Sequence, residues 1–150
     1  MSKEYESADL ILKLYEMRRE PVMREARAWM IGFFPESAQG IIQAMINPQT
    51  SAYYRMVTTY WDMAASFVLN GAIDEQMFTD ANAEHIVVFS KIEPFLAELR
   101  TTLQNPNMLK NLELLVMRMP NAKETLAARR EMMKRWMKAR EEMAKAPPQS

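Results

Sequence analysis

Residues 51–71 read SAYYRMVTTYWDMAASFVLNG, and this stretch predicts a buried helix around which the rest of the chain packs. Its apolar side chains recur at spacings of three and four residues, which is typical of one helix face. The residues on that face are Tyr53, Met56, Val57, Tyr60, Ala64, Phe67, Val68 and Gly71. The opposite face carries Trp61, Met63 and Ala65, and a helix that is apolar nearly all round is usually buried. Gly71 should end the helix, because glycine adopts the left-handed conformation readily.

The segments on both sides of this stretch also show helical patterns. Five prolines stand just ahead of such patterns, where a missing N–H costs little: Pro21, Pro35, Pro48, Pro106 and Pro120. We expect Ser7 to cap the first helix, and one long helix from Asp80 to Leu103 with a kink at Pro94. The predicted fold is all-α, a compact bundle of roughly seven or eight helices with a long basic amphipathic helix at its C-terminal end.

Length and composition predict one soluble helical domain. The 150 residues fit a single core, so we expect residues 1–145 to form one domain and residues 146–150, which contain Pro147-Pro148, to be a disordered tail. The acidic start of the chain differs from a signal peptide, and no stretch has the roughly 18 apolar residues of a membrane-spanning helix. Cysteine is absent. We therefore expect a cytoplasmic protein with no transmembrane segment.

The residue counts exclude several chemistries. Without cysteine there are no disulfides, Cys-ligated zinc sites or thiol nucleophiles, and a single histidine excludes a multi-histidine metal site. Three scattered glycines cannot form a phosphate-binding loop. His85 is interpreted as a helix-surface or first-turn residue rather than a general base, because no serine motif accompanies it. The prediction is a protein with no catalytic residue, no metal and no cofactor.

Methionine is unusually frequent, with 15 residues. Thioether side chains fill irregular gaps between helices, so we interpret most of them as core or interface residues. An adaptable hydrophobic groove is the alternative, because methionine-rich surfaces accommodate varied partners.

The last helix carries the main functional hypothesis. Residues 123–145 contain eight Lys or Arg and four Glu, whereas residues 1–122 contain eleven basic and fifteen acidic residues. An apolar strip runs beside these charges. We therefore predict a non-enzymatic module that binds a protein partner or a second copy of itself, with Met133, Trp136 and Met137 as anchors.

Two alternatives remain open. Nucleic-acid binding by the last helix would use six phosphate contacts: Arg129, Arg130, Lys134, Arg135, Lys138 and Arg140. A small-molecule site or an enzyme would use an aromatic pocket: Tyr53, Tyr54, Tyr60, Trp61 and Phe89. The charges of the last helix are also consistent with an ordinary solvated face.

Residues 61–75, WDMAASFVLNGAIDE, carry a resemblance to a known type of protein. An aromatic residue, a small apolar stretch, a Gly-x-Ile-Asp turn and a second helix ending in arginine, here Arg100, follow one another. This order resembles small bacterial all-helical proteins of unknown function, over about a third of the chain. The resemblance implies a bacterial helical domain and brings no activity and no site residues.

Overall fold

The computed structural model describes residues 2–148, and in that part of the chain every regular element is a helix. The elements are α1 Lys3–Arg18, α2 Pro21–Ile31, α3 Ala38–Ile46, α4 Ser51–Leu69, α5 Glu75–Ala81, α6 Glu84–Ile92, the 3-10 helix η1 Glu93–Phe95, α7 Leu96–Thr102, α8 Lys110–Val116 and α9 Ala122–Lys145. The all-α prediction is confirmed.

Helix α4 occupies the centre of the bundle, as its sequence predicts. It packs against α2, α3, α5, α6 and α8. Its Trp61 is 1% exposed, and Val57 and Ala64 are fully buried. Gly71 follows the helix with a φ of +81°, and the next residues fold back so that the N–H groups of Ala72 and Ile73 donate to the Phe67 carbonyl. The left-handed glycine therefore ends α4 as expected.

The segment predicted as one long helix from Asp80 to Leu103 is divided in the structure. Helix α5 ends at Ala81, and α6 gives way to η1 at Glu93. Pro94 has no N–H to donate to the Ser90 carbonyl, and that carbonyl accepts a hydrogen bond of 2.7 Å from Arg130 of α9 instead. The interruption expected at Pro94 is thus a 3-10 turn that joins α6 directly to α7, whereas the chain leaves the helical conformation between α5 and α6. The described residues contain nine α-helices in all.

The start of the chain differs from the expectation at Ser7. Helix α1 begins at Lys3, and the Ser2 hydroxyl caps it by accepting from the Tyr5 N–H at 3.2 Å. Ser7 is buried inside the helix, where its hydroxyl accepts from the Asp74 N–H at 3.0 Å. Ser7 therefore joins α1 to the turn before α5, a contact between residues far apart in sequence.

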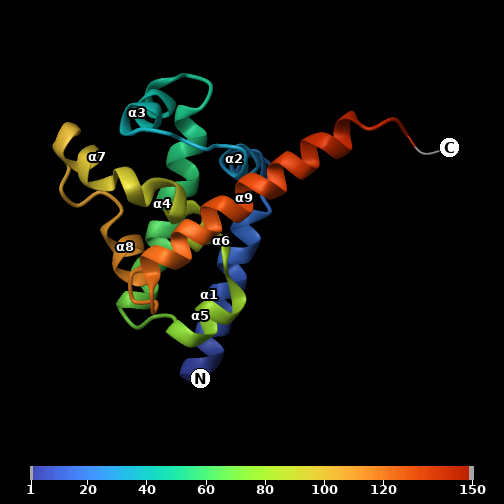
Figure 1. The fold of residues 1–150 in the computed structure, drawn as a ribbon. Coiled ribbons are helices and arrows are strands. Elements are labelled where there is room, and N and C mark those ends of the chain that lie inside the picture. Colours follow the sequence, from blue (N-terminus) through green and yellow to red (C-terminus); the bar gives the residue numbers. More distant parts are fainter. Residues whose placement is uncertain (1, 149–150) are drawn as a thin grey trace.

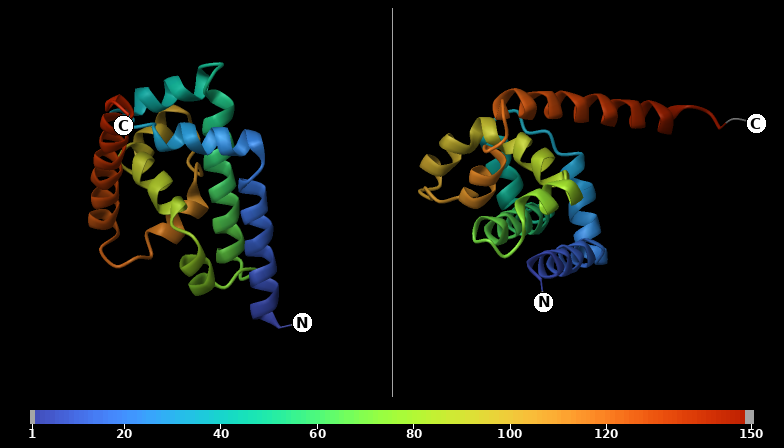
Figure 2. Two further views of the ribbon diagram at one scale, coloured as in Figure 1. Left: turned by 90° about the vertical axis from the view of Figure 1, so that its right-hand side faces the viewer. Right: turned by 90° about the horizontal axis from the view of Figure 1, so that it is seen from below.

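Both views in Figure 2 place α1 and α9 on opposite sides of the bundle. One hydrophobic cluster joins buried side chains from α1 to α9, and Leu126 is its member from α9. The first part of α9 packs against α6, whereas the second part extends away from the body (Figure 1). Of the expected tail, residues 146–148 are exposed and non-helical, and residues 149–150 lie outside the described residues.

Candidate functional site

Helix α9 consists of an inner segment, residues 122–130, and an outer segment, residues 131–145. In the inner segment Ala122 is 8% exposed and Leu126 is fully buried. Arg130 donates to the Ser90 carbonyl and lies 3.7 Å from the Glu93 carboxylate. These contacts fix the inner segment on the body. The outer segment still touches the body at Met137, close to Gly32, and its last turns extend beyond it (Figure 1).

The outer segment presents an apolar stripe to solvent. Met132, Trp136 and Met143 are 43%, 47% and 79% exposed, and Ala139 between them is also exposed. The four residues are separated by four, three and four positions, so they lie on one face of the helix. We call this face the α9 stripe. The Arg140 guanidinium lies 5.1 Å from the centre of the Trp136 ring, a cation–π distance that helps to hold the indole in place.

The three predicted anchors divide between two faces of α9. Trp136 belongs to the exposed stripe, whereas Met133 and Met137 are half-buried. The Met137 methyl lies close to Gly32 at the end of α2, about 3.7 Å from where a Cβ atom would stand. Sequence reasoning missed Met132 as an anchor, although its spacing of four from Trp136 was the available signal.

The six basic residues proposed as phosphate contacts have different surroundings. Arg130 is bound to the body, Lys134 lies 3.5 Å from Glu131, and Arg140 covers Trp136. Arg129 is half-buried, and Arg135 and Lys138 are exposed. The structure therefore engages half of the predicted set in contacts within the chain.

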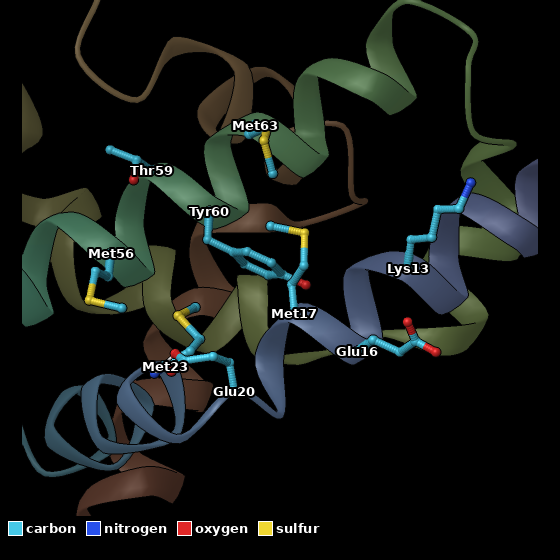
Figure 3. Close-up of a pocket in the computed structure, with 9 residues that line it drawn as sticks. All are labelled: Lys13, Glu16, Met17, Glu20, Met23, Met56, Thr59, Tyr60 and Met63. Atoms are coloured by element: carbon cyan, nitrogen blue, oxygen red, sulfur yellow. Dashed lines mark hydrogen bonds between the residues drawn. The ribbon is translucent and has the colours of Figure 1, made fainter.

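A second apolar surface lies between α1, α2 and α4. It is an open groove of about 910 Å³, and Figure 3 shows methionine side chains around the Tyr60 ring. The lining residues are Lys13, Glu16, Met17, Glu20, Met23, Met56, Thr59, Tyr60 and Met63. We call it the methionine groove. The sequence shows Met56, Tyr60 and Met63 on neighbouring turns, but only the fold adds Met17 and Met23 from the other two helices.

Three charged residues line the methionine groove. Lys13 and Glu16 belong to α1, and Glu20 stands between α1 and α2. Lys13 and Asp9 form an ion pair of 3.0 Å. The Glu20 carboxylate accepts from the N–H groups at the start of α2 and caps that helix. Two carboxylates against one ammonium give the lining of the groove a net charge of −1.

His85 is buried, which corrects the interpretation of a surface residue. It lies in the first turn of α6, is 4% exposed, and packs against Phe78 and Trp61 at ring distances of 5.0 and 5.6 Å. Burial, together with the charges of Arg129 and Arg18, lowers the pKa of His85 to about 4. The ring is therefore neutral at pH 7, and in the described structure its Nδ1 has no hydrogen-bond partner. Among the described residues, no carboxylate accepts a hydrogen bond from Nδ1 that would orient the ring for acid–base catalysis.

The aromatic residues proposed as a pocket are mostly core residues. Tyr54, Trp61 and Phe89 are at most 3% exposed, and Tyr53 is half-buried beside Trp29. Tyr60 is the member that lines the methionine groove. Its hydroxyl donates to the Leu14 carbonyl, which ties α4 to α1.

Lys91 is a buried charge with a structural explanation. Its ammonium donates to the carbonyls of Met30, Ile31 and Phe33 at 2.6, 2.8 and 2.9 Å, at the C-terminal end of α2. Three N–H groups thus meet three acceptors, at the helix end that favours a cation. Burial lowers the pKa of Lys91 to about 8. Sequence reasoning did not identify this residue.

Within residues 2–148, no three histidine, aspartate or glutamate side chains come together as a metal site. None of the described helices combines the length and apolar character that crossing a membrane requires.

Residues 5–119 match the family described as Domain of unknown function (DUF4760). The chain belongs to this family. The match runs from α1 to just beyond α8, so the DUF4760 region contains the methionine groove, whereas the α9 stripe follows it. The resemblance to helical proteins of unknown function is thereby confirmed, over more of the chain than the third first recognised. Comparison with curated proteins gives no match, and comparison with solved structures gives none either.

Proposed function

We propose that this DUF4760 protein is a non-enzymatic interaction module that binds a second copy of itself through the outer segment of α9. The observation that carries the proposal is the α9 stripe, an ordered apolar face on a helix that extends away from the body (Figure 1). Tryptophan is enriched among residues that dominate binding energy, and methionine is enriched at interfaces.

The position of the stripe supports this role. The fifteen residues of the outer segment span roughly 22 Å as a helix. Fixed by Leu126 and Arg130 at its inner end, this segment is already ordered before binding, which lowers the entropic cost of association. One hydrophobic cluster also extends from α1 to α9, which supports the expectation of a single domain over residues 1–145.

The test is the solution mass of the full chain, measured by light scattering across a range of protein concentrations. We expect a mass above the 17.5 kDa of one chain that increases with concentration. The triple variant Met132→Gln, Trp136→Gln and Met143→Gln should return to one chain, because its stripe is polar. A matched control, Ile46→Gln with Leu114→Gln, changes residues that are 71% and 49% exposed elsewhere and should associate like the wild type. A wild-type mass of 17.5 kDa at every concentration would contradict the proposal.

Nucleic-acid binding makes a different prediction for the same helix. Six basic residues of α9 were proposed as phosphate contacts. Of these, Arg135 and Lys138 are exposed and have no role assigned to them within the described chain. If they bound phosphates, affinity for a DNA duplex would fall steeply with salt, and their replacement by Gln would flatten that dependence. An absorbance ratio at 260 and 280 nm recorded during the mass measurement shows whether nucleic acid accompanies the purified protein.

A further inference from the structure

We infer that the surface receiving the α9 stripe is the methionine groove of a second copy. This inference rests on the proposed function, because it names the partner surface for the same contact. The two features are apolar surfaces of matching form: a projecting helical face and an open groove between three helices.

The chemistry of the groove suits a helix. Helix-in-groove recognition uses apolar anchors at spacings of three and four residues, and Met132, Trp136, Ala139 and Met143 have this spacing. Four methionines line the groove. Their unbranched thioether side chains adjust to an incoming aromatic ring and make favourable sulfur contacts with it. Met17 is itself 50% exposed, so part of this lining is in contact with water until a helix covers it.

The charges of the two surfaces are complementary. The lining of the groove has the net charge of −1 described above. Residues 134–145 of α9 contain five basic and two acidic residues, a net charge of +3. Opposite charges around an apolar contact accelerate encounter and fix its orientation.

The arrangement of the bundle directs this contact to another molecule. Both views in Figure 2 show α9 on one side and α1 on the other. Because the inner segment holds α9 against α6, a straight α9 does not reach the groove of its own chain. The stripe of one copy therefore fills the groove of the next, a head-to-tail contact that continues from copy to copy unless it closes into a ring.

Head-to-tail association allows a complementation experiment with two defective chains. The groove variant Met17→Arg with Thr59→Arg places positive charges at two exposed positions of the groove and leaves the stripe intact. The stripe variant with three Gln substitutions leaves the groove intact. Each variant alone should require at least about tenfold higher concentration to associate than the wild type. Mixed in equal amounts, they should form a complex of two chains and stop there, because one stripe and one groove remain.

The control for added charge is Leu12→Arg with Ile46→Arg, at exposed positions outside the groove, which should associate like the wild type. Circular dichroism of every variant checks that the helices are retained. A groove variant that associates like the wild type would overturn the inference while leaving the proposed function intact. A mixture that stays at one-chain mass would overturn it too. Stripes that bind one another would instead let the groove variant associate by itself. A wild type that never associates would refute the proposed function itself.

Discussion

Helices α4 and α9 are the two longest in the described chain, and each carries a tryptophan close to methionines, yet their surroundings are opposite. Trp61 of α4 is 1% exposed, whereas Trp136 of α9 is 47% exposed. Helices α2, α3, α5, α6 and α8 pack against α4, whereas the outer segment of α9 extends from the body (Figure 1). The same residue types thus build a core in one helix and an accessible surface in the other, because neighbouring helices decide which apolar faces are covered.

In sequence, α4 and α9 differ most clearly in their number of charged residues. The stretch of α4 has two charged residues, Arg55 and Asp62. Asp62 is employed structurally, since its carboxylate accepts from the Leu112 N–H at 2.9 Å near the start of α8. The outer segment of α9 has eight charged residues among fifteen, which keep it soluble around its apolar stripe.

The largest effect is expected at the centre of α4. Trp61→Ala should lower the free energy of unfolding by about 3–5 kcal/mol, because it removes a buried indole and leaves a cavity. Urea denaturation followed by circular dichroism measures this change. Trp61→Phe should cost less, since it keeps an aromatic ring beside Phe78. A cost below about 1 kcal/mol for Trp61→Ala would show that α4 is not central to stability.

A smaller loss is expected in the inner segment of α9. Leu126→Ala should lower the free energy of unfolding by about 3 kcal/mol, because Leu126 is fully buried in the hydrophobic cluster. Met132→Ala, less than two turns further along the same helix, is the control and should change it by less than about 0.5 kcal/mol. Equal changes in the free energy of unfolding at both positions, measured in the same urea experiment, would contradict the division of α9 into an inner and an outer segment.

The core beside α4 should also respond to acid. The folded pKa of His85, about 4, lies below the ordinary 6.5, so between these values the unfolded chain binds more protons. Stability from His85 is therefore full above about pH 6.5 and falls as the pH drops to 4, by at most about 3 kcal/mol. Urea midpoints of wild type and His85→Phe should diverge in this way. Parallel pH profiles would mean that His85 is not buried as a neutral ring.

The smallest effect on stability is expected at Trp136. Trp136→Ala should change the free energy of unfolding by less than about 0.5 kcal/mol, because the side chain lies on the solvent face of the outer segment. The same variant should lose association in light scattering. Loss of several kcal/mol of stability without loss of association would assign Trp136 to the core and not to an interface.

Local sequence signals predicted the helices well. The periodicity of residues 51–71 predicted α4 and its end at Gly71, and Pro94 indicated the interruption between α6 and α7. The basic charge of residues 123–145 and the apolar strip beside it predicted that the last helix is amphipathic. These features depend on neighbours in sequence, which a single chain displays directly.

Contacts between distant residues could not be predicted in this way. Ser7 is a good helix cap in isolation, but the turn at Asp74 captures its hydroxyl. His85 follows a glutamate and looks exposed, but Trp61 and Phe78 from other helices cover it. The methionine groove requires α1, α2 and α4 together. Each depends on tertiary packing that local patterns do not encode.

Hydrogen exchange of the full chain at a low and a high protein concentration tests the central claim most directly. If the outer segment of α9 binds a second copy, the amides of residues 131–145 should become more protected at high concentration, while those of α4 keep the same strong protection at both. Equal exchange of residues 131–145 at the two concentrations, across a range that reaches the highest soluble concentration, would contradict self-association through this segment.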